Sequence, residues 1–179
     1  MNHDPGYLGD PKLVELFPGI GKGINRLQKG NNFKIIVISN QSGISRGILT
    51  TQQVEKVNNR INEILSPFDC RIDAFYFCPY HPDFDSEEKS KCRKPSPQLV
   101  FEAAEEHNID LSSSYFVGDK PIDVECGINA GLKTVLINYE NDNGKINLLK
   151  NEGKTPTFIA YNFLDACDFI ISDFDGEVN

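Results

Sequence analysis

Short hydrophobic runs alternate along the chain with longer segments in which hydrophobic residues recur every three or four positions. The runs that we expect to form strands are 33–39, 72–78, 115–117 and 134–138. The segments with helical spacing are 51–65, 97–107, 121–130 and 163–171. Continuous hydrophobic runs are typical of buried parallel strands, and their alternation with helices is typical of layered α/β domains. The pattern therefore predicts a three-layer α/β fold with a doubly wound, mainly parallel sheet.

Polar residues at the ends of these segments support the predicted boundaries. Thr50 and Gln53 have the spacing of a capping box before the helix at 51–65, and Asn162 can cap the last helix. The polar, glycine-containing stretches 141–144 and 151–156 are interpreted as surface turns.

Length, charge and cysteine content narrow the class of protein. With 179 residues and 39% hydrophobic residues, the chain predicts one domain that spans 1–179. A net charge of -8 argues against nucleic acid or an anionic membrane as a partner. The sequence shows neither a signal peptide nor a long apolar stretch, so we expect a cytoplasmic monomer. Five unevenly spaced cysteines indicate free thiols or a partial metal site rather than a disulfide framework.

Polar residues follow the first strong strand, and ligands of open parallel sheets bind beyond the carboxyl ends of the strands. Ser39, Asn40, Gln41 and Ser42 lead into two glycines and Arg46. Hydroxyls and backbone N–H groups of such a loop can hold a phosphoryl group, and an arginine can pair with a second anion. The alternative is a polar turn with a solvated arginine.

Two basic residues precede the helix at 97–107. Arg93 and Lys94 stand next to a helix N-terminus, which itself favours negative charge. A lysine neutralises phosphate as a point charge, whereas an arginine can bind it through two parallel hydrogen bonds. Two basic residues in an ordinary loop are the alternative interpretation.

The third predicted strand ends in Gly-Asp and is followed by a second acid. Asp119 and Asp123 are four positions apart across the start of the helix at 121–130. Both carboxylates can then face the carboxyl edge of the sheet and coordinate Mg²⁺, which prefers oxygen ligands. A simple helix-capping pattern is the alternative.

In order along the chain, a strand-end Ser39, Lys94 and the acids Asp119 and Asp123 resemble the motifs of the haloacid dehalogenase superfamily. The strings S-N-Q-S-G-I-S-R-G, C-R-K-P-S-P and Y-F-V-G-D-K-P-I-D resemble the D-glycero-D-manno-heptose 1,7-bisphosphate 7-phosphatase branch, which also contains histidinol-phosphate phosphatases. The resemblance extends over nearly the whole chain, and no large cap insertion separates the motifs.

The resemblance implies a Mg²⁺-dependent phosphatase in which a strand-end aspartate attacks a phosphoryl group and water cleaves the aspartyl-phosphate. The implied substrate is a small phosphorylated sugar, from which the 7-phosphate is removed. Histidinol-phosphate hydrolysis and an inactive sugar-phosphate-binding protein are the alternatives. The resemblance assigns phosphoryl binding to Ser39, charge balance to Lys94, and metal binding to Asp119 and Asp123. It assigns sugar-phosphate contacts to Asn40, Gln41, Ser42, Arg46, Arg93 and Lys120.

The family's nucleophile motif, D-x-D-G, falls a few residues before the segment that matches 2–7. We therefore expect Met1 to be an internal methionine, with the nucleophile on a strand encoded in frame upstream, and we expect 1–179 alone to be nearly inactive. Loss of that strand should leave two neighbouring strands with unpaired edges. Within the chain itself, a D-x-D-G string occurs at 173–176. We interpret it as an acidic tail of the terminal helix rather than as a permuted nucleophile motif.

Many relatives carry four zinc ligands in a C-x-H and C-x-C loop, of which this chain retains Cys78 and Cys92. Tyr80 and Ser90 occupy the other two positions. His81 could supply a third ligand, but a three-ligand site serves no evident structural purpose. We therefore expect no zinc and expect the loop to pack as ordinary polypeptide.

Overall fold

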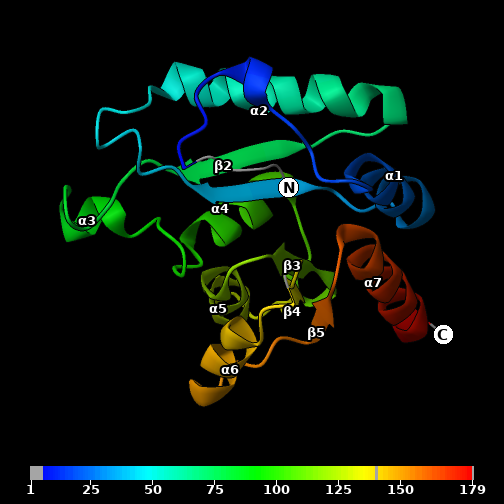
Figure 1. The fold of residues 1–179 in the computed structure, drawn as a ribbon. Helices are drawn as coiled ribbons and strands as arrows, with labels where there is room; N and C mark the ends of the chain where they lie inside the picture. Colours follow the sequence, from blue (N-terminus) through cyan, green and yellow to red (C-terminus); the bar gives the residue numbers. More distant parts are fainter. Residues whose placement is uncertain (1–5, 140, 179) are drawn as a thin grey trace. The chain divides into compact units, whose positions relative to one another are not determined.

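The computed structural model describes residues 6–139 and 141–178, which form two compact units, Met1–Arg93 and Lys94–Asn179 (Figure 1). The first unit contains η1 (Pro11–Leu13), α1 (Ile20–Asn31), β1 (Ile36–Asn40), α2 (Thr51–Leu65), η2 (Ser66–Phe68), β2 (Ala74–Cys78) and α3 (Glu87–Ser90). The second contains α4 (Gln98–His107), η3 (Leu111–Ser113), β3 (Tyr115–Gly118), α5 (Pro121–Asn129), β4 (Lys133–Ile137), α6 (Asn143–Asn151), β5 (Phe158–Ala160) and α7 (Phe163–Val178). That residues 1–179 form a single domain stays a prediction.

In the first unit, β1 and β2 form a parallel pair with α2 as the crossover between them. Figure 1 shows α2 running along the pair. The predicted capping box is confirmed, because Thr50 N donates to Gln53 Oε1 at 2.8 Å and Gln53 N donates to Thr50 Oγ1 at 3.2 Å. One face of α2 is buried through Val54, Val57, Ile61 and Leu65, and α1 buries Ile20, Ile24 and Leu27.

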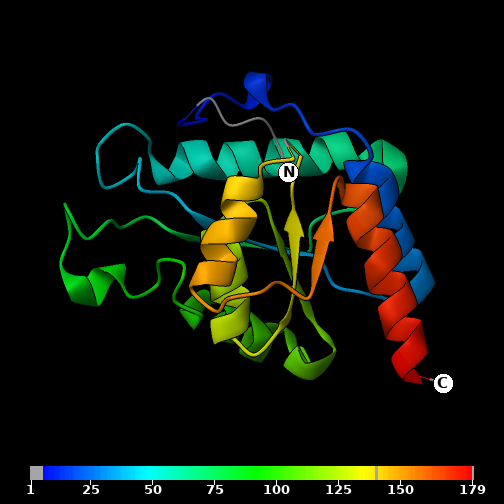
Figure 2. The same cartoon turned by 60° about the horizontal axis from the view of Figure 1, so that its bottom comes forward.

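In the second unit, β3, β4 and β5 are parallel and adjacent in that order. Helices α5 and α6 lie on one side of these strands and α7 lies on the other (Figure 2). The central strand β4 is the most buried, with Val135 and Leu136 fully enclosed. A Cβ at Gly127 of α5 would stand 2.5 Å from Thr134 Cγ2, so this glycine lets α5 pack closely on the strands.

The predicted α/β class with parallel strands is confirmed, but the strands form two sheets rather than one. Within the described residues, β1 pairs only with β2, and β3 pairs only with β4. Strands β1 and β3 therefore each have one edge without a strand partner among these residues. The reason for the difference is that no strand within 6–139 and 141–178 bridges β1 and β3 by backbone hydrogen bonds.

The prediction of a turn at 141–144 is wrong, because Asn143 begins α6. Asp142 caps the helix, and its Oδ1 accepts a hydrogen bond from Gly144 N at 2.7 Å. The short helix is held by burial of Leu149, which is 1% exposed, and by the partly buried Ile146, which packs on the same cluster as Leu149. Helix α1 and strand β5 were not predicted, although Ile20, Ile24 and Leu27 of α1 have helical spacing.

The predicted terminal helix is confirmed and continues through the D-x-D-G string at 173–176. Its predicted cap is also present, since Asn162 Oδ1 accepts from Asp165 N at 2.9 Å. The carboxylate of Asp173 accepts hydrogen bonds from Tyr115 Oη at 2.5 Å and Lys133 Nζ at 2.6 Å. This carboxylate thus ties α7 to β3 and β4 and does not have the strand-end position of a nucleophile.

We expect Asp173→Asn to lower the free energy of unfolding by about 1–2 kcal/mol at neutral pH, because two hydrogen bonds to a carboxylate are weakened. The Lys133 ammonium, followed by the Tyr115 hydroxyl, lowers the pKa of Asp173. A carboxyl whose pKa is depressed by folding stabilises the protein above its unfolded pKa of about 3.9. That contribution is lost as the pH falls through the folded pKa, so the difference between wild type and variant should shrink below about pH 4.

Urea unfolding between about pH 2 and pH 7 measures this difference. Glu105→Gln is the control, because Glu105 is an exposed carboxylate of α4 in the same unit. A wild-type advantage over Asp173→Asn that stays constant across the whole pH range would contradict the assignment.

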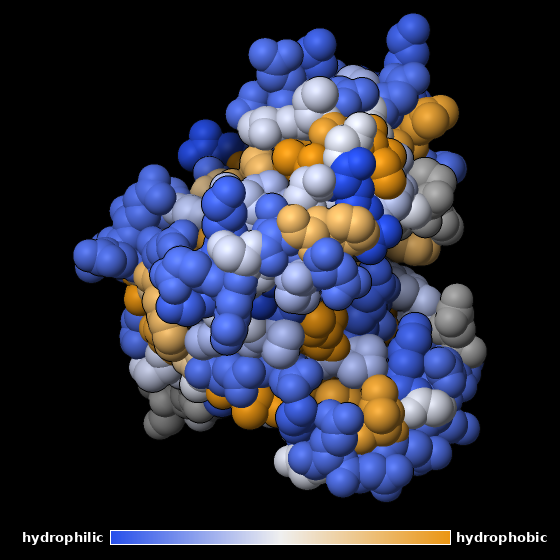
Figure 3. Space-filling view, turned by 90° about the vertical axis from the view of Figure 1, so that its left-hand side faces the viewer, coloured by the Kyte–Doolittle hydropathy of each residue, from blue (hydrophilic) through white to orange (hydrophobic). Residues whose placement is uncertain are grey.

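Within the described part of the chain, no helix combines the length and the apolarity that crossing a bilayer requires. On the face shown in Figure 3, hydrophobic residues form separate small patches in a mostly hydrophilic surface. Nothing in this view resembles a continuous apolar interface.

Candidate active site

The loop after β1 is fastened to the end of β2 within the first unit. Ser39 and Asn40 are the last two residues of β1. Gln41 N donates to Cys78 O at 2.7 Å and Ser45 N donates to Pro79 O at 3.2 Å. The side-chain Nε2 of Gln41 also donates to Ser39 Oγ at 3.3 Å. The Ser39 hydroxyl, predicted to bind a phosphoryl group, therefore lies at the end of β1. Backbone hydrogen bonds to Cys78 and Pro79 hold the loop that follows.

Glycine at two positions allows this loop to turn sharply. A Cβ on Gly43 would stand 2.6 Å from the Tyr7 ring, so only glycine admits this close contact. Gly47 has φ +69°, a left-handed conformation that most other residues adopt only at an energetic cost. Arg46 N donates to Ser42 O at 3.2 Å, so the loop is compact between these two residues.

Two arginines of the first unit lie in the loops that follow β1 and β2. Arg46 stacks on the exposed ring of Phe84, with its guanidinium carbon 4.8 Å from the ring centre. The guanidinium of Arg93 donates to Tyr80 O at 3.4 Å. Burial lowers the pKa of Arg93, and the positive charge of Arg46 lowers it further. Two cations held within electrostatic reach of each other favour an anion between them.

In the second unit, Lys94 and Asp123 form a nearly buried ion pair. Lys94 Nζ lies 2.7 Å from Asp123 Oδ1, and the side chains are 12% and 8% exposed. Asp123 Oδ2 accepts a hydrogen bond from Lys120 N at 3.2 Å. Gly118 makes room for this carboxylate, because a Cβ there would stand 2.2 Å from Asp123 Cβ. Both oxygens of Asp123 are therefore already used within the protein.

Asp119 directly follows β3 and lies at the same end of the strands as Tyr139, which follows β4 by two residues. Burial, followed by the negative charge of Asp119, raises the pKa of Tyr139 to about 12. Sequence reasoning missed Tyr139 as a neighbour of the acids. Its position after the predicted strand 134–138 was the signal that could have revealed it.

The structure thus brings the predicted site residues together in two groups. The first unit holds Ser39, Asn40, Gln41, Ser42, Arg46 and Arg93 around the exits of β1 and β2. The second holds Lys94, Asp119, Lys120 and Asp123 around the exit of β3. Phe84, which stacks on Arg46, was not predicted, because an exposed aromatic residue in a loop carries no sequence signal of its contact partner.

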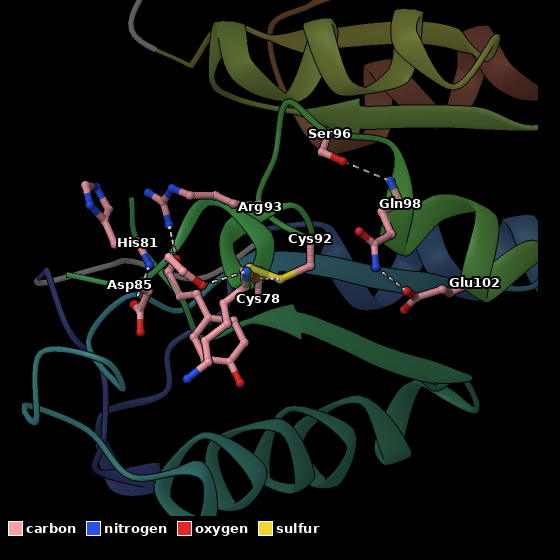
Figure 4. Close-up of a disulfide and its surroundings, with 11 residues drawn as sticks. Cys78, His81, Asp85, Cys92, Arg93, Ser96, Gln98 and Glu102 are labelled. Atoms are coloured by element: carbon pink, nitrogen blue, oxygen red, sulfur yellow. Dashed lines mark hydrogen bonds between the residues drawn. A yellow bond between two sulfur atoms is a disulfide. The ribbon is translucent and has the colours of Figure 1, made fainter. Parts of the chain in front are cut away.

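The prediction of free thiols or a partial metal site rather than a disulfide is wrong for Cys78 and Cys92, because the two form a disulfide (Figure 4). Their sulfur atoms bond each other and are not available as thiolate ligands. His81 instead accepts a hydrogen bond from Asp83 N at 3.2 Å through Nδ1. The other cysteines, Cys70, Cys126 and Cys167, are buried and lie outside the disulfide.

Among the described residues, no group of three or more His, Cys, Asp or Glu side chains is arranged to hold a metal. Mg²⁺ needs fewer protein ligands than zinc, since it retains waters and binds through one or two carboxylates together with substrate phosphate. Asp119 fits this requirement, because it leaves the end of β3 and Asp123 is occupied by Lys94 and Lys120 N.

Comparison with protein families and solved structures identifies similar proteins. A family model described as HAD-hydrolase-like matches residues 91–166, and one described as polynucleotide kinase 3 phosphatase matches residues 13–125. D,D-heptose 1,7-bisphosphate phosphatase from B. bronchiseptica, crystallised with magnesium and phosphate, superimposes with a TM-score of 0.81. The superposition covers 96% of this chain and 93% of that one at 24% identity, and it establishes the fold.

Two relatives are similar in sequence. D-glycero-D-manno-heptose-1,7-bisphosphate 7-phosphatase from Chlorobaculum tepidum is 47% identical over 113 residues, which span 59% of this chain and 57% of that protein. D-glycero-beta-D-manno-heptose-1,7-bisphosphate 7-phosphatase from Helicobacter pylori is 36% identical over 157 residues, which span 87% of this chain and 82% of that protein. The chain therefore belongs to the D-glycero-D-manno-heptose-1,7-bisphosphate 7-phosphatase family of HAD-like hydrolases.

Proposed function

We propose that this protein is a Mg²⁺-dependent phosphatase that removes the 7-phosphate of D-glycero-D-manno-heptose 1,7-bisphosphate. The observation that carries the proposal is the nearly buried pair of Lys94 and Asp123 beside Asp119, in a chain 36% identical to a phosphatase of this name. Asp123 holds the Lys94 ammonium, and Asp119 supplies a second carboxylate directly after β3. Such an ammonium suits a phosphoryl group, and such a carboxylate suits its metal.

Each site residue then has a separate task. In the first unit, Ser39 has a hydroxyl that can donate to a phosphoryl oxygen. In the second unit, the Lys94 ammonium can offset negative charge on a phosphoryl group during transfer. Asp123 keeps the Lys94 ammonium in place and is a positioning residue. Asp119 would hold Mg²⁺, which when bound draws charge from the phosphoryl oxygens and orients the phosphate for in-line attack.

The nucleophile is proposed to lie on residues other than 1–179. Within 1–179 the D-x-D-G string at 173–176 is part of α7, and Asp173 is held by Tyr115 and Lys133. We define the extended chain as 1–179 preceded by a strand that ends in D-x-D-G, the motif that the family resemblance places ahead of residues 2–7.

The pair of Arg46 and Arg93 supports a substrate with a second phosphate. We propose that both guanidiniums bind the phosphate that is not hydrolysed, with Phe84 supporting Arg46 from behind. Histidinol phosphate has a single phosphate and would leave two like charges unneutralised. The heptose bisphosphate is therefore favoured over this alternative substrate.

We expect Arg46→Gln in the extended chain to raise KM for the heptose bisphosphate about tenfold or more, because one charge-assisted phosphate contact is lost. The value of kcat should change much less, since Arg46 does not touch the reacting phosphate. Steady-state phosphate release over a range of substrate concentrations measures both constants.

Arg60→Gln is the matched control, because Arg60 is an exposed arginine of α2 paired with Glu63. It should leave KM unchanged. If Arg46→Gln also leaves KM unchanged, or if histidinol phosphate is hydrolysed more efficiently than the bisphosphate, the assignment of Arg46 and of the substrate is wrong. An extended chain that binds the bisphosphate but never hydrolyses it would support the inactive binding protein instead.

A further inference from the structure

The Cys78–Cys92 disulfide closes the loop formed by residues 79–91. Cys78 is the last residue of β2 and is fully buried, whereas Cys92 is partly exposed. Their Cα atoms are 5.5 Å apart although 14 positions separate them in the sequence. Figure 4 shows the bond between the strand end and the segment that leads into Arg93. The loop therefore starts and ends at one covalent link.

Among residues 6–139 and 141–178, few hydrogen bonds join this loop to the rest of the first unit. No residue from 79 to 93 is buried, and the hydrogen bonds of His81 N with Asp85 and of Arg93 N with Ser90 O lie within the loop itself. The contacts with the β1 exit are the bond from Ser45 N to Pro79 O and the stacking of Arg46 on Phe84. A covalent bond across the loop also limits the conformations that the loop can adopt if its other contacts open. The disulfide is thus a major constraint on the loop.

The constraint acts directly on Arg93, which follows Cys92 in the sequence. Its guanidinium donates to Tyr80 O, and Arg46 is close enough to lower its pKa in addition to the effect of burial. In the absence of an anion, repulsion between the two guanidiniums pushes them apart. Holding them in place before substrate arrives reduces the ordering cost of binding.

We propose that the Cys78–Cys92 disulfide positions Arg93 for binding of the substrate phosphate, and that its reduction by a cellular thiol weakens substrate binding reversibly. This inference rests on the proposed function of the arginine pair. Of the two cysteines, the partly exposed Cys92 is the one that a thiol can reach, so the thiolate attacks the Cys92 sulfur and releases Cys78 as a thiolate that takes up a proton. A second thiol then attacks the mixed disulfide, which frees Cys92 and leaves the oxidised small disulfide. Disulfides in reducing compartments are commonly of this transient, sensing kind.

The presence of the bond is tested by counting thiols in 1–179. Alkylation under denaturing conditions without reductant, followed by mass spectrometry, should label Cys70, Cys126 and Cys167, and prior reduction should add Cys78 and Cys92. Labelling of all five cysteines in protein kept under air would overturn the inference.

The positioning role is tested by calorimetric binding of the heptose bisphosphate to 1–179 and by kinetics of the extended chain. Reduction with dithiothreitol should raise Kd and KM about tenfold while kcat changes less than about threefold. The Cys92→Ser variant should show the raised Kd and KM whether or not reductant is present. Cys70→Ala, which removes a buried cysteine outside the disulfide, should keep the full response to reductant.

Unchanged Kd and KM after reduction would refute the positioning role even if the thiol count confirms the bond. A lower kcat with an unchanged KM would also refute it, because that result would mean that the bond supports turnover and not substrate binding. An oxidised extended chain that binds the bisphosphate in a reductant-sensitive way but does not hydrolyse it would uphold the inference and refute the proposed phosphatase activity instead.

Discussion

Asp119→Asn is expected to lower Mg²⁺-dependent phosphate release by the extended chain roughly a thousandfold, which corresponds to about 4 kcal/mol of transition-state stabilisation. Asp119 leaves the end of β3 beside the nearly buried Lys94–Asp123 pair, and Asp123 already uses both carboxylate oxygens. The amide of asparagine carries no charge with which to hold Mg²⁺. Phosphate release at saturating substrate, measured over a Mg²⁺ titration, gives the effect on kcat and on the Mg²⁺ requirement.

Glu105→Gln is the control for this experiment, because Glu105 is an exposed carboxylate of α4 in the same unit. It should retain wild-type activity and the wild-type Mg²⁺ requirement. If Asp119→Asn retains activity within a few-fold of the wild type, Asp119 does not hold the metal.

Gly118→Ala is expected to lower the free energy of unfolding by about 3 kcal/mol, because the added methyl group overlaps a nearly buried ion pair. An ideal Cβ at this position stands 2.2 Å from Asp123 Cβ and 2.5 Å from Asp123 Oδ2. Asp123 must move, and Lys94 then loses its partner in a largely dehydrated place. Urea unfolding of 1–179 measures the loss, and the extended chain should lose phosphatase activity with it.

Gly30→Ala is the matched control, because Gly30 is an exposed glycine of α1 with no atom within 4 Å of an added Cβ. It should leave stability unchanged or raise it by about 0.5–1 kcal/mol through helix propensity. A Gly118→Ala protein as stable as the wild type would show that the close contact with Asp123 is not required.

The elements with a strong local pattern could be predicted from the sequence. Helix α2 has the predicted bounds because its hydrophobic spacing and the Thr50–Gln53 box agree. Helix α6 could not be predicted, because it is short and rests on burial of Leu149 in the folded unit. A local sequence window contains no information on which neighbour covers one leucine.

The same distinction applies to the site. The spacing of Asp119 and Asp123 after a hydrophobic run was visible in the sequence, whereas the pairing of Asp123 with Lys94 joins residues 29 positions apart and needed the fold. The disulfide was mispredicted, because Cys78 and Cys92 were compared with zinc ligands while their closeness in space depends on the path of the loop.

The most direct test of the account is phosphate release from D-glycero-D-manno-heptose 1,7-bisphosphate by the extended chain and by 1–179, each with and without Mg²⁺. We expect the extended chain to release one equivalent of phosphate, to leave the heptose 1-phosphate, and to require Mg²⁺. We expect 1–179 to be at least roughly a thousandfold slower, because removal of a catalytic nucleophile has effects of this size or larger. Equal rates for the two chains, or release that does not depend on Mg²⁺, would contradict it.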